Sequence, residues 1–507
     1  MARSCFTLTA GQVLAVLPSW LKQQLLAICR ENGSALYLTG GSVRDLLRGE
    51  SPADIDITVP RGAQDLARQL AARTQGALVP LGRGEDAARV VCRKTSVDFS
   101  AFRSGATTIT EDLRHRDLTI NALAVHLDPL LDNEGEGTGG DAVILLDPTG
   151  GLADLAQGLI RLAGPASLAE DPLRLLRVFR FAAVYGFRIE RQTLAAVQHQ
   201  QGAIARVASE RIAHELDLIM ASPRAYAAFS AMADCGLLWQ LIPELKAGQG
   251  MAQPSSHHLD VLAHSLETLH QMGKLWQGVE QYFPTQGARM VHILADECYR
   301  RRLNWAALLH DIGKPFTHAV REDKGGRITF YNHDRAGAAL FRQFAKRLHW
   351  SNEESERVAL LIDNHMRPFH LANEARKGRL TLRASIRMIK RVQRDLAALF
   401  LLSMADALAG QGPEAIPSME RELANLYSRL EQVRQEHVEP VQAAPPLVNG
   451  HDLIAVLHLE PGPMFKEVLT AVSEAQMEGL VRDREEALRW VAVYVEHGMK
   501  QKQPEKE

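Results

Sequence analysis

Hydrophobic residues in the first part of the chain come in short runs that turn residues separate. Between Leu36 and Val125 the runs include LYLTGG, DIDITV, RVVC, VDFSAF and LTINALAV. Short apolar runs bounded by Gly, Pro and Asp predict strands, here with one or two helices between them. The GG pair after LYLT is expected to join a strand to a helix. This part of the sequence therefore predicts a small mixed sheet with helices.

The pattern changes to helical periodicity after about Leu152. Stretches such as LAEDPLRLLRVFRFAAVYGF and SERIAHELDLIMAS repeat apolar residues at helical spacing. We expect one helix from Ala169 to Phe187, because its acids come first and its arginines last, the polarity that the helix dipole favours. The whole pattern predicts an α+β protein in which a mostly helical remainder follows the sheet.

Composition narrows the class of protein. The 507 residues exceed what one hydrophobic core holds, so roughly three or four domains are expected. Hydrophobic residues make up 46% of the chain and charged residues 23%, which is typical of a soluble globular protein. We find no signal peptide and no apolar stretch long enough to span a membrane. The five cysteines form no CxxC pair, which favours reduced thiols in the cytoplasm and argues against a zinc–thiolate site.

The formal net charge of −2 does not by itself indicate a nucleic-acid partner. Arginine is nevertheless concentrated in EDPLRLLRVFRFAAVYGFRIER, which carries Arg174, Arg177, Arg180, Arg188 and Arg191. A local basic face can bind phosphate groups whatever the total charge. On this feature alone, phosphate binding and a solvated arginine-rich helix face are equally open.

Two carboxylates, Asp54 and Asp56, stand one residue apart in the predicted strand DIDITV. They point to the same face of a strand, where like charges repel unless a cation lies between them. Two Mg²⁺ ions held by such a pair can bridge a triphosphate and an attacking hydroxyl in nucleotidyl transfer. Asp98, in the predicted strand VDFS, can complete the metal-binding set. A solvated strand face is the alternative.

The motif GGSVRD lies just upstream of this pair. Gly40 and Gly41 let backbone N–H groups approach a phosphate, and the helix that follows adds positive potential at its N-terminus. Arg44 can hold a triphosphate through two N–H groups. Together with the two aspartates, this motif makes phosphoryl or nucleotidyl transfer the favoured interpretation.

Five motifs over residues 36 to 216 occur in an order that matches a known family. They are GGSVRDLLRG…DIDIT, EDLRHRDLTINALA, LLDPTGGLADLAQGLIR, EDPLRLLRVFRFAA and ASERIAHEL. In these motifs the chain resembles the class II tRNA nucleotidyltransferases and bacterial poly(A) polymerases of the polymerase-β-like superfamily. The resemblance implies a polymerase-β-like nucleotidyltransferase head followed by a helical neck and body.

The resemblance also implies roles for single residues. Asp54 and Asp56 bind the catalytic Mg²⁺ ions, with Asp98 as the third catalytic carboxylate. Arg44 and Asp45 lie around the phosphates, and Arg116, Asp117 and Asn121 hold the sugar and phosphates of the incoming nucleotide. The complete predicted nucleotide-binding set is Gly40, Gly41, Arg44, Asp45, Arg116, Asp117, Asn121, Asp171, Arg174 and Arg177.

Asp171 and Arg174, expected at positions i and i+3 on one helix face, would read the edge of the nucleotide base. Cytosine and adenine each present an amino donor beside a ring-nitrogen acceptor, which a carboxylate and a guanidinium match. Guanine and uracil present the wrong pattern. Without the motif, an i,i+3 surface salt bridge is the simpler interpretation of this pair.

Histidines and aspartates recur through the later helical region, around HHLDVLAHSLETL, LLHDIGKP, FYNHDRAGA, IDNHMRP and LSMADALAG. Imidazole and carboxylate groups bind transition metals that can activate water for attack on a phosphate ester. The pattern resembles the HD superfamily of metal-dependent phosphohydrolases. That resemblance assigns one divalent metal, such as Ni²⁺ or Mn²⁺, to His264, His310, Asp311 and Asp406, and a second metal or a substrate phosphate to His333 and His365. A structural relic is the alternative, and His257 and His258 receive no role.

The C-terminal stretch VNGHDLIAVLHLEPGPMFKEVLTAVSEAQMEGLVRDREEALRWV resembles the tail of HD-bearing tRNA nucleotidyltransferases. We therefore expect four parts: a catalytic head at 1–150, a helical neck and body at 151–245, an HD domain at 246–411 and a tRNA-binding tail at 412–507. The expected partners are tRNA, CTP and ATP, without DNA or a membrane.

The chain departs from the family pattern at two places. Only SGATTIT stands between Arg103 and Glu111, where enzymes that add complete CCA usually carry a longer flexible segment. His115 replaces the first of the two arginines that usually precede the aspartate of the second motif. Addition of CCA and of CC alone are therefore both open. The rival functions are a poly(A) polymerase, an HD phosphohydrolase that uses its head only to bind RNA, and a non-catalytic RNA-binding scaffold.

Overall fold

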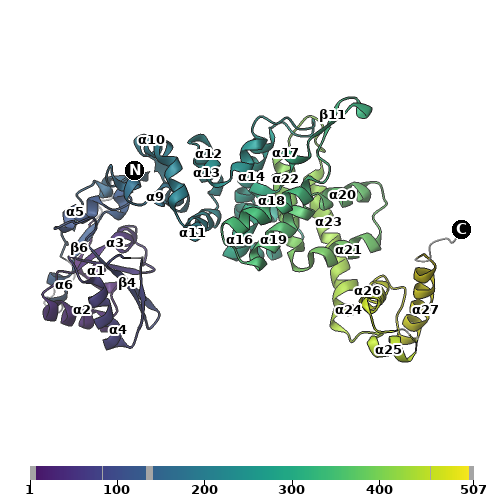
Figure 1. The fold of residues 1–507 in the computed structure, drawn as a ribbon, viewed down its shortest axis with the longest axis horizontal. Coiled ribbons are helices and arrows are strands. Elements are labelled where there is room, and N and C mark those ends of the chain that lie inside the picture. The colour runs from purple at the N-terminus through teal and green to yellow at the C-terminus, as the bar shows by residue number, and fades with distance from the viewer. Residues whose placement is uncertain (1–6, 83, 133–140, 457, 459, 502–507) are drawn as a thin grey trace. The chain divides into compact units, whose positions relative to one another are not determined.

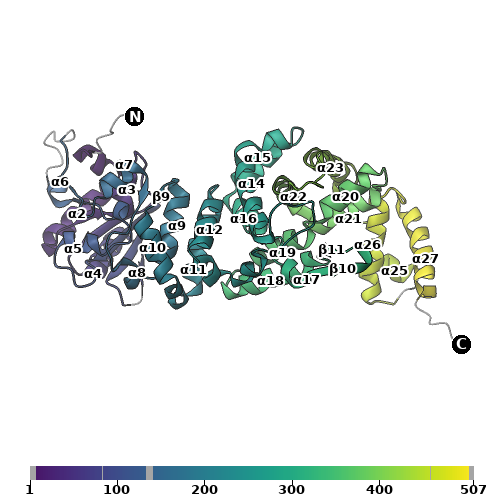
Figure 2. The same ribbon diagram turned by 90° about the horizontal axis from the view of Figure 1, so that it is seen from above.

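The computed structural model describes residues 7–82, 84–132, 141–456, 458 and 460–501 (Figures 1 and 2). The chain divides into two compact units, Met1–Ile242 and Pro243–Glu507, which are described separately. None of the helices in the described ranges is long and apolar enough to cross a membrane.

The first unit contains a mixed sheet in the order β3-β4-β5-β2-β1-β6-β7. The strands are β1 (Tyr37–Thr39), β2 (Ile55–Val59), β3 (Ala77–Pro80), β4 (Ala87–Cys92), β5 (Thr95–Ala101), β6 (Ala124–His126) and β7 (Leu145–Leu146). β2 and β5 run parallel and the other neighbours antiparallel. A small second sheet pairs β8 (Leu159–Ile160) with β9 (Arg188–Ile189).

In the described ranges, seven α-helices lie along the chain before, between and directly after the strands of the seven-stranded sheet. They are α1 (Ala10–Ala15), α2 (Ser19–Asn32), α3 (Gly40–Leu47), α4 (Ala63–Thr74), α5 (Ile109–Arg114), α6 (Asp128–Asp132) and α7 (Gly151–Gln157). The buried residues of α4 include Ala63, Leu66, Ala67 and Leu70, one face of a helix, and this face packs on β3, β4 and β5. α5 begins at a capping box in which Thr108 and Glu111 satisfy each other's backbone N–H groups.

The rest of the first unit is helical. It comprises α8 (Ser167–Glu170), α9 (Arg174–Tyr185), α10 (Arg191–Gln200), α11 (Ser209–Met220), α12 (Ala225–Asp234) and α13 (Leu237–Leu241). The expected single helix from Ala169 to Phe187 is wrong, because the chain is extended at Asp171 between α8 and α9. Pro172 explains the break: its ring disfavours a helical conformation in the residue before it.

The second unit is almost entirely helical. Its first helices are α14 (Val261–Tyr282), α15 (Gly287–Ala295), α16 (Glu297–Leu309), α17 (Lys314–Thr317), α18 (His333–Arg347) and α19 (Asn352–Asn364). The hairpin β10 (Ala319–Arg321) and β11 (Arg327–Thr329) lies between α17 and α18. Then follow α20 (Arg367–Arg376), α21 (Leu382–Val392), α22 (Leu396–Ala409), α23 (Met419–Val433), α24 (Glu439–Ala443), α25 (Gly450–Ala455), α26 (Pro463–Met477) and α27 (Arg484–Gln501).

Two separate packing arrangements build this unit. α14, α16 and α22 pack on one another, and every residue of α22 from Leu396 to Asp406 is buried. α25, α26 and α27 share a core that includes Leu453, Val468, Val472 and Val491. The architecture confirms the predicted α+β class, with a small mixed sheet followed by a mostly helical chain.

One close backbone contact packs α7 against the turn that carries the predicted nucleotide-binding residue Asn121. A Cβ atom added at Gly151 would overlap the carbonyl oxygen of Thr119, in the short 3-10 helix η1 (Thr119–Asn121). Gly151→Ala should therefore lower the free energy of unfolding of the first unit by about 1–3 kcal/mol. Gly202→Ala is the matched control, because no atom lies within 4 Å of its added Cβ. Equal urea-unfolding midpoints for the two variants would contradict this prediction.

Candidate active sites

Strand register brings the three predicted catalytic carboxylates together. Asp56 on β2 is directly opposite Asp98 on the parallel strand β5, and Asp54 immediately precedes β2. Ser42 fixes the start of the strand: its hydroxyl donates to the carbonyl of Asp54 at 3.0 Å and accepts the N–H of Asp56 at 2.8 Å. Burial raises the pKa of Asp56, although Arg116 nearby opposes this shift. A cluster of carboxylate oxygens is the donor set that Mg²⁺ prefers, so these residues fit the predicted ion.

The glycine pair lies against this cluster. Gly40 has φ +63°, and a Cβ there would lie 2.9 Å from Nη1 of Arg116 and 3.2 Å from Oδ2 of Asp56. A Cβ at Gly41 would lie 3.1 Å from the same carboxylate oxygen. The two glycines thus let the start of α3 approach Asp56, and the backbone N–H of Ser42 donates to Asp56 at 3.3 Å.

Arg89, on β4, supplies the cation that the like charges require. It donates to Asp54 Oδ2 at 2.9 Å and to Asp98 Oδ1 and Oδ2 at 2.7 and 2.8 Å. These contacts raise the pKa of Arg89, with the hydrogen bond to Asp98 as the main cause. Arg89 could not be recognised from the sequence, because its relation to Asp98 depends on the antiparallel pairing of β4 with β5.

Arg116 is buried behind the aspartate pair. Its Nη2 donates to the hydroxyls of Thr39 at 3.0 Å and Thr58 at 2.7 Å, and its Nε donates to Asp112 at 3.2 Å. Burial lowers the pKa of Arg116 to about 10, with a further contribution from Arg103. Although burial raises the pKa of Asp112, the guanidinium groups of Arg116 and Arg103 lower it overall. Asp112 is therefore a buried anion held by two arginines.

The other predicted nucleotide-binding residues form one hydrogen-bonded network. Arg44 donates to Asp45 at 2.9 Å and to Asn121 at 2.6 Å, and Asn121 donates to Asp117 at 3.2 Å. Arg177 on α9 donates to Asp117 Oδ2 at 2.7 Å. Burial alone would raise the pKa of Asp117, but Arg177 lowers it well below its usual range, so Asp117 carries a negative charge.

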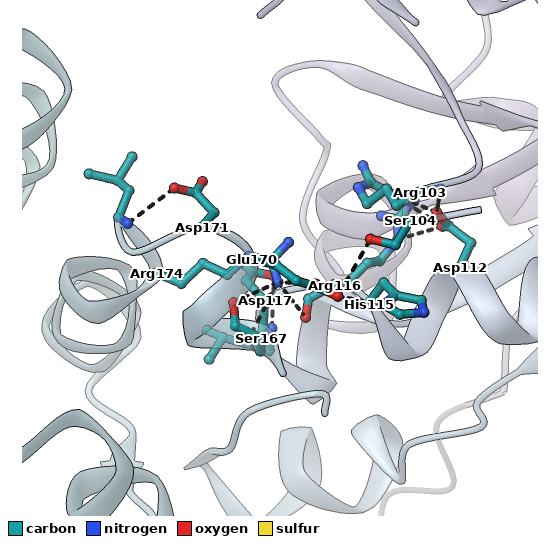
Figure 3. Close-up of polar contacts among 12 residues, drawn as sticks. Arg103, Ser104, Asp112, His115, Arg116, Asp117, Ser167, Glu170, Asp171 and Arg174 are labelled. Atoms are coloured by element: carbon teal, nitrogen blue, oxygen red, sulfur yellow. Dashed lines mark hydrogen bonds and ion pairs between the residues drawn. The ribbon is translucent and has the colours of Figure 1, made fainter. Parts of the chain in front are cut away.

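The side chains of Asp171 and Arg174 do not form the expected helical pair within the described part of the chain. Asp171 accepts from the N–H of Leu173 at 3.1 Å and from Arg211 at 2.8 Å. Arg174, the first residue of α9, contacts Glu170, Ser167 and the backbone of Arg116 (Figure 3). The surface-salt-bridge interpretation is therefore wrong, since each residue has partners of its own.

The predicted HD residues gather in the second unit. Buried side chains in two groups offer ligand atoms within 4.8 Å of one another: His264, His310 and Asp406, and Asp311, His333 and His365. Asp311 belongs to the second group but is also close to the first. Its Oδ1 lies 3.4 Å from His333 Nε2, and its Oδ2 lies 3.1 Å from His310 Nε2. The resemblance assigned Asp311 to the first metal, and these distances also bring it within reach of the second.

Three of these histidines are oriented as metal ligands usually are. In each ring, Nδ1 faces the carbonyl oxygen of the residue three positions earlier. The distance is 2.9 Å from His310 to Ala307, 2.7 Å from His333 to Phe330 and 2.7 Å from His365 to Ile362. Donation from Nδ1 leaves Nε2 as the lone-pair nitrogen that can bind a metal. Burial also lowers the pKa of His365, which favours the neutral ring that a metal requires. The donor set thus fits a divalent transition metal.

Comparison with known proteins identifies the family. Family models match as follows: the poly A polymerase head domain at 36–161, the RNA- and SrmB-binding region of polymerase A at 186–248, the HD domain at 261–409 and tRNA nucleotidyltransferase domain 2 at 341–492. The A-adding tRNA nucleotidyltransferase of Deinococcus radiodurans is 34% identical, over 90% of this chain and 95% of that protein. The chain belongs to the tRNA nucleotidyltransferase family.

Other relatives carry different product names. The CC-adding tRNA nucleotidyltransferase of Thermus thermophilus is 32% identical over 89% of this chain and 92% of its own length. The Multifunctional CCA protein of Pseudomonas aeruginosa is 33% identical over 71% of this chain and 81% of its own length. The Thermotoga maritima CCA-adding enzyme complexed with tRNA shares the fold, with a TM-score of 0.60 at 22% identity over 96% of this chain and 99% of that one.

Membership of the tRNA nucleotidyltransferase family confirms the resemblance drawn from the five motifs and the HD pattern. Arg89 and Glu170 are among the head-site residues that were not predicted from the sequence. Arg89 stands in an apolar strand pattern that gave no signal of its own. Glu170 lies in the fourth motif, directly before Asp171, and this position next to a predicted base-reading residue could have indicated a role in the site.

The histidine geometry generates a prediction about metal content. His365→Gln should lower the affinity of the second unit for Mn²⁺ or Ni²⁺ by roughly tenfold or more, because an amide replaces an Nε2 donor in the buried cluster. His370→Gln is the control, since His370 is exposed on α20. Equal metal retention by the two variants after dialysis, measured by elemental analysis, would contradict the assignment of His365 as a ligand.

Proposed function

We propose that the first unit transfers nucleotides from a nucleoside triphosphate, CTP or ATP, to the 3′ end of tRNA. The observation that carries this proposal is the carboxylate cluster of Asp54, Asp56 and Asp98, which the parallel register of β2 and β5 brings together beside a glycine turn. The names of the relatives support tRNA as the acceptor. A solved structure with the same fold is described as a complex with ATP and another as a complex with CTP.

Each part of the network has a task in this reaction. Asp54, Asp56 and Asp98 hold the Mg²⁺ ions, which when bound stabilise charge on the attacking and leaving oxygens. Arg44 and the backbone N–H groups after Gly40 bind the triphosphate. Asn121 and Asp117 orient the sugar, and Arg177 keeps Asp117 charged for this task.

Asp171 and Arg174 recognise the base in this proposal, although they do not pair with each other. The carboxylate accepts from the amino group that cytosine and adenine share, and the guanidinium donates to the neighbouring ring nitrogen. The contacts of Arg174 within the described residues run through Nη1, which leaves Nε and Nη2 to donate to the base. The extended backbone at Asp171 separates the two groups.

The second unit is proposed to be a metal-dependent phosphohydrolase. His264, His310, Asp311 and Asp406 hold one divalent metal such as Ni²⁺ or Mn²⁺, and His333 and His365 hold a second with Asp311 between them. His310 and Lys314, whose Nζ lies 2.6 Å from Asp311 Oδ2, lower the pKa of that carboxylate and keep it ionised despite its burial. We also propose that the chain divides into four parts, with boundaries after residues 150, 245 and 411. The last part binds tRNA in this proposal, and the protein acts in the cytoplasm.

The proposed product is CC, one part of the complete CCA sequence. The segment between Arg103 and Glu111 is short and ends in the capping box of α5 rather than in a long extension. The two relatives reported above that match about nine tenths of this chain carry names of partial activities, CC-adding and A-adding. A single terminal A is therefore the second candidate, and complete CCA is the third.

A primer-extension assay separates these products. Purified protein with Mg²⁺ receives tRNA ending in the discriminator base, in C or in CC, with CTP, ATP or both. We expect addition of two C residues to the discriminator end and no A on tRNA-CC. A added only to tRNA-CC selects the second candidate, addition of all three nucleotides selects the third, and a long A tail selects a poly(A) polymerase.

The same assay with Asp56→Ala tests the chemistry. Loss of this carboxylate should reduce the rate of addition by at least about 10³-fold, because it removes a ligand of the catalytic metals. Release of phosphate from small phosphoesters should be unchanged, and His310→Ala should show the reverse pattern. Extension of tRNA by Asp56→Ala at the wild-type rate would contradict the proposed active site.

A further inference from the structure

His115 is the residue that departs from the second motif, and the structure gives it a specific partner. It lies at the C-terminal end of α5, next to the buried Arg116. Its Nδ1 is 2.6 Å from Oε1 of Glu170, the last residue of α8 (Figure 3). Nδ1 can donate to this carboxylate in the protonated ring and in one of the two neutral tautomers. The contact therefore does not require a charged histidine.

Glu170 contacts two different parts of the site with its two oxygens. Oε1 faces His115 and also accepts from the hydroxyl of Ser104 at 3.4 Å. Oε2 lies 3.1 Å from Nη1 of Arg174. Figure 3 shows the carboxylate between the loop after Arg103 and the start of α9. Glu170 thus links α5 and the short SGATTIT segment to the residue proposed to read the base.

Among the described residues, the hydrogen-bonding partners of Arg174 all contact its Nη1. Its Nη1 lies 3.0 Å from the carbonyl oxygen of Ser167 and 3.4 Å from that of Arg116, in addition to Glu170. Carbonyl oxygens fix the position of this nitrogen, but Glu170 supplies the negative charge among these partners. The side chains of Arg174 and Glu170 are only 12% and 23% exposed, so their pairing is screened less than a surface ion pair would be.

We infer that His115, acting through Glu170, positions Arg174 for recognition of the nucleotide base. His115 is a positioning residue: it fixes the rotamer of Glu170, and Glu170 fixes the plane of the guanidinium. Without His115, Glu170 can turn toward solvent, and Arg174 then presents its remaining N–H groups in more than one direction. This inference rests on the proposed role of Arg174 as a base reader.

The inference predicts a loss of selectivity rather than a general loss of rate. His115→Ala should lower the ratio of kcat/KM for CTP over that for UTP by roughly tenfold, mainly through KM, because uracil lacks the donor and acceptor pattern that Asp171 and Arg174 read. His115→Asn should restore most of the ratio, because its Nδ2 can donate from a position close to that of the imidazole Nδ1. Glu170→Gln should resemble His115→Ala, since it removes the charge that holds Arg174.

His126→Ala is the matched control. His126 forms a comparable partly exposed pair with Asp128, at 3.1 Å, in the same unit. If His115 had a merely structural role, His115→Ala would lower kcat/KM for CTP and UTP equally. Thermal unfolding of all four variants shows whether each of them is folded. An unchanged CTP/UTP ratio in His115→Ala, or no rescue by His115→Asn, would overturn the inference.

Binding of CTP and UTP without tRNA, measured by calorimetry on the full chain, separates this inference from the proposed function. If the wild-type protein binds one nucleotide selectively and His115→Ala does not, the positioning role holds even if no tRNA is extended. If the wild-type protein extends tRNA but both proteins bind the two nucleotides with the same ratio of affinities, the inference fails and the proposed function stands. Equal binding of CTP and UTP by the wild-type protein would also overturn the inference.

Discussion

The head site depends on one buried guanidinium, that of Arg116. It binds a threonine hydroxyl on each of the strands β1 and β2 and the buried carboxylate of Asp112 on α5. Its backbone carbonyl is also a partner of Arg174 on α9. Loss of one partner from such a buried charged network typically costs about 3–5 kcal/mol, because the remaining charge is left uncompensated. Arg116 therefore holds together β1, β2, α5 and α9, the elements that carry or adjoin the proposed metal-binding carboxylates and the proposed base reader.

The two sites compensate their charges in different ways. In the head, Arg89 and Arg116 balance the acidic residues, so the carboxylates can stay close together. In the second unit, imidazoles surround Asp311 and Asp406, and backbone carbonyls orient three of the rings. Carboxylates alone favour Mg²⁺, whereas imidazole-rich sites favour transition metals. The ligand chemistry of each site therefore matches the reaction proposed for it.

Much of this arrangement could be predicted from sequence, and the exceptions have physical reasons. The motif around Asp54 and Asp56 indicated a metal site, and the strand runs indicated the mixed sheet. The contact of Arg89 with Asp98 could not be predicted, since it depends on which strands pair and in which register. The break at Asp171 was predictable, because a proline follows it. The place of Asp311 next to both ligand groups required the three-dimensional packing of α14, α16, α18, α19 and α22.

The central claim is that Asp54, Asp56 and Asp98 form the metal site of nucleotide transfer. It is tested most directly by a crystal structure of the full chain with Mn²⁺ and a non-hydrolysable CTP analogue, in which anomalous scattering locates the metal. The account predicts Mn²⁺ bound by Asp54 and Asp56, next to the triphosphate. Mn²⁺ found only among the histidines of the second unit, with the nucleotide bound away from β2, would contradict it.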